Sequence, residues 1–118
     1  MNTNYLKESP QIIKEFLGYM QTIKGKSERT VNEYYVDLRT FFRYIKISKG
    51  LVNNSEQFDK IDISDIDIEL IKDITLTDAF EYMNYLMNER KNGASARSRK
   101  SSSLRTFFKY LTNKTGKL

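Results

Sequence analysis

Apolar residues along this chain recur at every third or fourth position, which is the period of an α-helix buried on one side. The first apolar stripe consists of Ile12, Ile13, Phe16, Leu17, Met20 and Ile23. Ser9 suits an N-cap and Pro10 a first helical position, while Gly25 suits the residue just past a helix end. The pattern therefore predicts a first helix that starts at Pro10 and ends near Lys24.

A second helix is expected after a turn of only about three residues, with Ser27 as its N-cap. Its apolar face contains Val31, Tyr34, Tyr35, Leu38, Phe42 and Ile45, with Phe41 on the flank. A connection this short predicts an antiparallel helical hairpin. Residues 49–60 then form a polar loop that contains Gly50, Asn53, Asn54 and Ser55.

Residues 61–74 carry two competing patterns. Residues 61–63 alternate like a strand, whereas the later isoleucine and leucine positions keep helical spacing. Ser64 followed by Asp67 resembles a capping box, so we expect a short helix from about Asp65 to Asp73. Nine acidic residues and two lysines lie between positions 56 and 81, which does not favour nucleic-acid binding there.

Two more helices are expected in the later part of the chain. Thr77 is the expected N-cap of the first, and Asn92 with Gly93 ends it. One side of this helix carries Ala79, Phe80, Met83, Leu86, Met87 and Arg90. Ser95 is the expected N-cap of the last helix, which runs to about Asn113. The plan is a helix pair, an acidic linker with a short helix, and a second helix pair, so the predicted fold class is all-α over one domain, residues 1–118.

The second and the last predicted helices share an eight-residue repeat. Residues 38–45 read LRTFFRYI and residues 104–111 read LRTFFKYL, with six positions identical. At helical spacing the large apolar positions share one face, and the arginine, threonine and second basic position share the other. The repeat predicts two equivalent helices, each with a buried apolar face and an outward basic face.

The amino-acid composition limits the catalytic and metal-binding chemistry that this chain could perform. The chain has no Cys, which leaves no disulfide framework, thiolate metal site or cysteine nucleophile, and no His, the commonest general base and metal ligand. Tyr34, Tyr44 and Tyr110 fall at or beside core positions, which favours packing over a nucleophilic role. We therefore expect no cofactor, no metal and no catalysis by this chain alone. No apolar run has transmembrane length and no signal-peptide pattern is present, so a cytoplasmic location is expected.

Charge is distributed unevenly along the sequence. Residues 1–89 hold eleven basic and all fifteen acidic residues, a net charge of −4, whereas residues 90–118 hold nine basic and no acidic residues, a net charge of +9. A basic block of this kind is typical of a surface that faces a polyanion. The alternative is a basic tail that only aids solubility, although its interleaved aromatic residues argue against a disordered tail.

Helical-wheel positions place basic and polar residues opposite both cores. The stripe of the second helix is Arg29, Asn32, Val36, Arg39, Thr40 and Arg43, and that of the last helix is Ser98, Ser102, Arg105, Thr106 and Lys109, with Arg99 beside them. Arginine binds guanine edges or phosphates, asparagine reads adenine, and hydroxyls reach phosphate oxygens. The candidate DNA-binding residues are Lys26, Ser27, Arg29, Thr30, Asn32, Arg39, Arg43, Ser95, Arg97, Ser98, Arg99, Lys100, Ser102, Arg105 and Lys109.

The alternative for each stripe is an ordinary solvated helix face. That alternative is stronger for the second helix, where Glu28, Glu33 and Asp37 reduce the net charge to +1. It is weaker for the last helix, which contains no acidic residue. A helical module that docks an acidic protein partner is the competing functional hypothesis.

The motif residues resemble a known family. The spacing of Ser27, Thr30, Tyr34, Asp37-Leu38 and Phe41 is similar to the S-x-x-T-x-x-x-Y-x-x-D-L-x-x-F opening of the N-terminal core-binding (SAM-like) domain of Xer-type tyrosine recombinases and phage integrases. The run from Arg99 to Leu111 is similar to the end of the same module.

The resemblance implies four principal helices in two crossed antiparallel hairpins, with the second and last helices in the major groove of double-stranded DNA. It implies that a separate catalytic domain, not included in these residues, performs strand exchange. It also implies that the isolated domain is a monomer and that the full protein is a tetramer on DNA. Tyr35 and Val36 stand where relatives often carry basic residues, so the last helix is expected to carry more of the binding.

Overall fold

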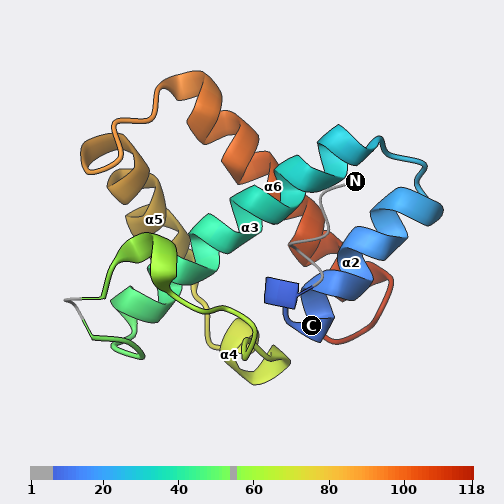
Figure 1. Cartoon of the computed structure of the whole chain (residues 1–118), viewed down its shortest axis with the longest axis horizontal. Helices are drawn as coiled ribbons and strands as arrows, with labels where there is room; N and C mark the ends of the chain where they lie inside the picture. The colour runs from blue at the N-terminus through green and yellow to red at the C-terminus, as the bar shows by residue number, and fades with distance from the viewer. Residues whose placement is uncertain (1–6, 54–55) are drawn as a thin grey trace. The chain divides into compact units, whose positions relative to one another are not determined.

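The computed structural model describes residues 7–53 and 56–118, which form an all-α chain (Figure 1). Its helices are α2 (Gln11–Thr22), α3 (Glu28–Ser48), α4 (Ile68–Lys72), α5 (Leu76–Asn88) and α6 (Ala94–Asn113), with a 3-10 turn, η1 (Phe58–Lys60). The predicted fold class, four principal helices and a short extra one, is confirmed. Asn54 and Ser55 of the predicted polar loop lie outside the described residues. The chain divides into two compact units, residues 1–68 and 69–118.

In the first unit α2 and α3 pack as an antiparallel hairpin (Figure 1). Phe16 of α2 meets Tyr34 of α3 edge to face, with ring centroids 5.6 Å apart. The fully buried side chains of the two helices are Ile13, Phe16, Leu17, Leu38, Phe41, Phe42 and Ile45. Each contributes about 1.5–3 kcal/mol by leaving water, so this apolar face is what fixes α3 in place.

The ends of α2 differ slightly from the prediction. Pro10 is the N-cap rather than the first helical residue, because its extended ψ of 161° turns its carbonyl toward the N–H groups of Ile13 and Lys14. The predicted cap, Ser9, is buried instead. The helix ends at Thr22, two residues before the predicted end, and Gly25 takes a φ of +66° so that the chain can reverse into α3.

The start of α3 is as predicted, whereas its buried face is wider. The Ser27 hydroxyl oxygen accepts from the Thr30 N–H at 3.2 Å, which confirms this N-cap. Phe41 is 1 % exposed and therefore core rather than flank, and Thr40 is buried although it was predicted to face away. The segment after η1 is hydrogen-bonded to Arg43 and Lys46 of α3 and adds Ile61, Ile63 and Ile66 to the buried set.

The predicted capping box at Ser64 and Asp67 is wrong. The Asp62 carboxylate accepts from the N–H of Ser64 at 3.1 Å and from its hydroxyl at 2.9 Å, which makes a local turn. The chain continues as a turn after Ser64, and α4 begins only at Ile68.

In the second unit α5 and α6 form the other hairpin, and both predicted N-caps are wrong. Thr75, not Thr77, caps α5: its hydroxyl accepts from Asp78 N–H at 3.2 Å, and the Asp78 carboxylate accepts from Thr75 N–H at 2.8 Å. Gly93, not Ser95, is the N-cap of α6, and no side chain caps this helix. Its end at Asn113 is as predicted.

The buried side of α5 also differs from the predicted one. Tyr82 and Leu86 are fully buried, as are Phe107 and Leu111 of α6. Phe80 and Met87 of the predicted apolar side are instead exposed, along with Leu76. Tyr82, which the predicted side did not include, lies four residues before Leu86, so the two buried side chains share one helix face.

Candidate nucleic-acid interface

The two copies of the octapeptide have the same local structure and similar buried positions. Both adjacent phenylalanine pairs are T-shaped, with centroids 5.2 Å apart in α3 and 5.7 Å apart in α6. In both copies the threonine hydroxyl donates to the carbonyl four residues earlier, Thr40 to Val36 and Thr106 to Ser102. Three equivalent core positions are buried in both copies: Leu38 and Leu104, Phe41 and Phe107, Ile45 and Leu111. The fourth differs, because Phe42 is buried whereas Phe108 is half-buried.

The basic residues of the two copies lie in different surroundings. Arg105 and Lys109 of α6 are exposed. The equivalent Arg39 and Arg43 of α3 are half-buried and bound to other parts of the first unit. The repeat therefore predicted the backbone and core correctly, but its outward basic face is exposed on α6 alone.

The candidate residues on α6 form the more open of the two surfaces. Those exposed are Ser95, Ser98, Arg99, Ser102, Arg105 and Lys109. All acidic residues of the chain precede position 90, so this helix carries positive charge with no acidic side chain of its own. Arg97 is half-buried and donates to the Asn92 carbonyl at 2.6 Å, which ties the α5–α6 loop to the helix. Lys100 is only 9 % exposed, so it offers the least surface of the set.

The start of α3 carries five of the remaining candidates. Lys26, Ser27 and Arg29 are exposed, while Thr30 and Asn32 are half-buried. The Arg29 side chain is 90 % exposed and lies 3.6 Å from the Glu33 carboxylate, an (i, i+4) ion pair that solvent screens strongly. These residues are thus accessible, although the charge of Arg29 is partly offset.

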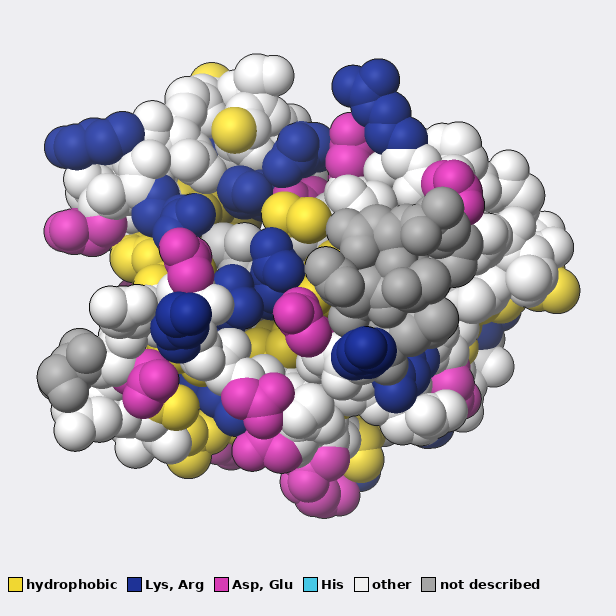
Figure 2. All heavy atoms as spheres, in the orientation of Figure 1, with side chains coloured by type: hydrophobic (Ala, Val, Ile, Leu, Met, Phe, Trp, Pro, Cys, Tyr) yellow, Lys and Arg dark blue, Asp and Glu magenta, His cyan; other side chains and the backbone are white. Residues whose placement is uncertain are grey.

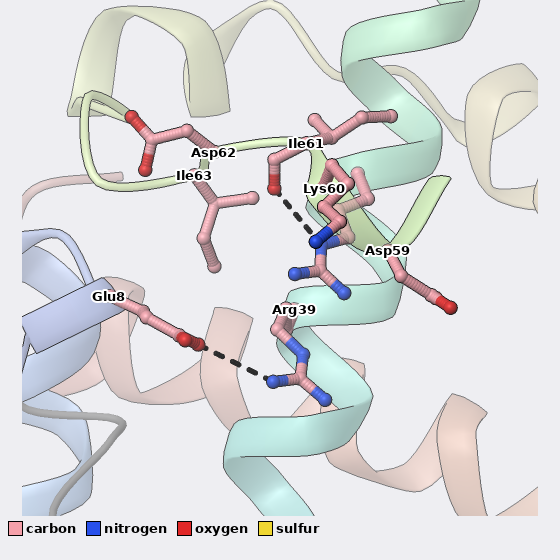
Figure 3. A pocket seen from close by; sticks show the side chains of 8 residues that line it. Glu8, Arg39, Asp59, Lys60, Ile61, Asp62 and Ile63 are labelled. Carbon is pink, nitrogen blue, oxygen red and sulfur yellow. Dashed lines mark hydrogen bonds and ion pairs between the residues drawn. The ribbon is translucent and has the colours of Figure 1, made fainter. Parts of the chain in front are cut away.

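Further along α3, Arg39 belongs to a network that the sequence did not reveal. The hydroxyl of Tyr35 donates to the Glu8 carboxylate, and Arg39 Nη1 lies 3.2 Å from the Tyr35 oxygen. Arg39 Nη1 also lies 3.4 Å from the Glu8 carboxylate (Figure 3). The Arg39 guanidinium also lies over the Tyr35 ring, 5.0 Å from its centroid. The hydrogen bond from Tyr35, followed by the charge of Arg39, holds the pKa of Glu8 below its usual value. Burial, followed by the bond to Glu8, raises the pKa of Tyr35.

Arg43 and Lys46 attach the returning segment to α3. Arg43 Nε donates to the Ile61 carbonyl at 3.0 Å, and Lys46 Nζ donates to the Asp62 carbonyl at 2.7 Å and pairs with the Asp65 carboxylate. Burial, followed by the nearby charge of Arg39, lowers the pKa of Arg43. Because these partners lie 16 to 19 residues away in sequence, helical periodicity could not have identified them.

Beside these residues the first unit has a pocket of about 340 Å³. Its lining is Glu8, Arg39, Arg43, Asp59, Lys60, Ile61, Asp62 and Ile63, so three cations and three carboxylates surround an apolar floor (Figure 3). Figure 2 shows that both basic side chains (dark blue) and acidic side chains (magenta) reach the surface.

Within the described ranges, 7–53 and 56–118, no three His, Cys, Asp or Glu side chains gather closely enough to hold a metal ion. Nor does any helix there combine the length and apolarity needed to cross a membrane.

The sequence comparisons agree with this all-α architecture. Residues 12–117 match the family described as phage integrase, N-terminal SAM-like domain, and the chain belongs to that family. The predicted resemblance is therefore confirmed. No solved structure matches the chain.

The relatives are named as tyrosine recombinases. The chain is 46 % identical over 105 residues to tyrosine recombinase XerC of Caldanaerobacter subterraneus subsp. tengcongensis, which covers 89 % of this chain and 30 % of that protein. It is 33 % identical over 98 residues to tyrosine recombinase XerC of Leptospira interrogans, covering 83 % of this chain and 25 % of the relative. It is 31 % identical over 102 residues to tyrosine recombinase XerD of Listeria monocytogenes, covering 85 % and 28 % respectively. The chain thus spans less than a third of each of these relatives.

Proposed function

We propose that this chain is the DNA-binding part of a site-specific tyrosine recombinase, and that it holds duplex DNA while another part of the recombinase exchanges strands. The family membership and the three recombinase relatives support this role. In this proposal residues 1–118 act as one binding domain in the cytoplasm, and α3 and α6 both contact one half of the target site.

The observation that carries the proposal is the exposed surface of α6. Arg99, Arg105 and Lys109 are exposed on a helix without acidic residues, and Ser98 and Ser102 lie among them. Lysine and arginine on DNA phosphates release condensed counterions, which supplies most of non-specific affinity. Arginine and serine on the same face can additionally contact base edges and phosphate oxygens. On this basis α6 contributes more of the binding free energy than α3.

Fluorescence anisotropy with a labelled duplex at increasing salt tests the proposal directly. If about four phosphates are contacted, the logarithm of the association constant falls with the logarithm of salt concentration at a slope near −3.6, about −0.9 per contact. Lys109→Ala should make this slope shallower by about one contact. Lys72→Ala on α4 is the matched control, an exposed lysine of the same unit that should leave the slope unchanged.

Two outcomes would reject the proposal. One is an absence of salt-dependent duplex binding by the folded chain. The other is binding that responds equally to Lys109→Ala and Lys72→Ala, since net charge alone would then account for it. Capture of an acidic protein partner without duplex binding would favour the competing docking function.

A further inference from the structure

The pocket of the first unit brings two arginines of one helix face together. Arg39 and Arg43 are four residues apart on α3, and both line the cavity. Each guanidinium is partly removed from water, so their mutual repulsion is weakly screened. Such a pair is stabilised by an anion placed between the two groups.

The hydrogen-bonding capacity of this pair is only partly used by the described residues. Arg43 gives its Nε to the Ile61 carbonyl, which leaves its two terminal nitrogens for another acceptor. Arg39 donates through Nη1 alone, and among the described residues its buried Nε has no hydrogen-bond partner. Guanidinium groups with free parallel N–H donors suit the oxygens of a phosphate group.

One carboxylate already occupies part of this space. Figure 3 shows Glu8 and Arg39 pointing toward each other, while Asp59 points away from both. The Asp62 carboxylate is bound to the N–H and hydroxyl of Ser64. Within residues 7–53 and 56–118, Glu8 is therefore the carboxylate that pairs with Arg39, and it lies at the surface, with 47 % of its side chain exposed. The charges of Asp59 and Glu8 also act on Arg43.

We propose that this pocket is a phosphate-binding site formed by Arg39 and Arg43, and that the Glu8 carboxylate occupies the phosphate position until a ligand displaces it. Because Glu8 is exposed, its side chain can swing into water without opening the core. The Tyr35 hydroxyl, released from Glu8, becomes a further donor to the incoming oxygen. This inference rests on the proposed function where the phosphate belongs to DNA, and stands apart from it where the phosphate belongs to a small molecule.

Nuclear magnetic resonance of the ¹⁵N-labelled chain tests the pocket without DNA. The Nε–H signals of Arg39 and Arg43, assigned with Arg39→Lys and Arg43→Lys, should shift saturably on addition of inorganic phosphate at constant ionic strength. The shifts should saturate at lower phosphate in Glu8→Gln, because the competing charge is gone while the amide can still accept from Tyr35. Glu15→Gln, an exposed acid on α2, is the matched control and should titrate like the unmodified chain.

A duplex titration identifies the source of the phosphate. If a DNA phosphate enters the pocket, Glu8→Gln should raise duplex affinity about three- to fivefold over Glu15→Gln, the size expected for one partly screened charge. If the arginine signals shift with inorganic phosphate but the two variants bind duplex equally, the site serves a small phosphate compound. Unmoved arginine signals in both Glu8→Gln and the unmodified chain would overturn the inference. Duplex binding through α6 would survive that result, so the two proposals fail separately.

Discussion

Equivalent arginines of the repeat should respond differently to removal. Arg39 packs on the Tyr35 ring and lies near the Glu8 carboxylate, whereas Arg105 is exposed. A partly exposed cation–π contact contributes about 0.5–1 kcal/mol, and the ion pair adds about 0.2–1 kcal/mol, since 27 % of the Arg39 and 47 % of the Glu8 side chain remain in solvent. Arg39→Ala should therefore lower the free energy of unfolding by about 1–2 kcal/mol. Arg105→Ala should change it by less than about 0.5 kcal/mol.

Urea unfolding followed by circular dichroism measures both variants, and the duplex titration measures their binding. We expect Arg105→Ala to weaken binding by about 1–3 kcal/mol if it reaches a base edge, with the unfolding midpoint unchanged. Arg39→Lys separates charge from geometry, because lysine keeps the charge but loses the planar stacking on Tyr35. Equal destabilisation by Arg39→Ala and Arg105→Ala would refute the conclusion that the two copies of the repeat differ in their surroundings.

Three other predictions concern single residues. Lys91 has a φ of +56°, which glycine adopts more readily than other residues. In urea titrations, the free energy of unfolding of Lys91→Gly should therefore exceed that of Lys91→Ala by about 0.5–1 kcal/mol. A lower free energy of unfolding for Lys91→Gly than for Lys91→Ala would contradict this backbone argument. Thr75→Ala should cost about 1 kcal/mol in the same assay while Thr77→Ala costs little, and the reverse order would restore Thr77 as the cap. The lowered pKa of Glu8 means that its contribution to stability is present above the usual value of 4.5 and is lost as pH falls from there through the folded-state pKa. Glu8→Gln should therefore flatten the decrease in stability between neutral and acidic pH, and an unchanged acid profile would show that Glu8 contributes nothing.

The sequence was sufficient to predict the helix caps and core positions that depend only on neighbouring residues. Ser27 was identified as an N-cap because a serine before a helical stripe needs only its own neighbours, and Leu38 and Leu104 were placed in the core by period alone. The same reasoning misplaced the cap of α5, because Thr75 and Thr77 are both suitable residues and only the Asp78 side chain decides between them.

Long-range contacts account for what the sequence did not reveal at the candidate site. Arg39 and Arg105 occupy identical positions in the repeat, so no local pattern distinguishes them. What separates them is the pairing of Arg39 with Glu8, 31 residues away. Arg43 was likewise predicted to face solvent, but it donates to the carbonyl of Ile61, 18 residues away. Predicting either would require knowing how the loop and the N-terminal residues pack.

The two helices of the second unit begin in contrasting ways, and this has a consequence for their dynamics. A reciprocal capping box closes the first turn of α5, whereas α6 begins at a glycine without a side-chain cap and continues through a serine-rich sequence of low helix propensity. The first turn of α6 should open more readily than that of α5, and its amide hydrogens should exchange with solvent faster. A polyanion bound along α6 would suppress this opening, so part of the binding free energy would offset the cost of ordering the helix. Slower amide hydrogen exchange at residues 94–98 in the bound state would measure this ordering.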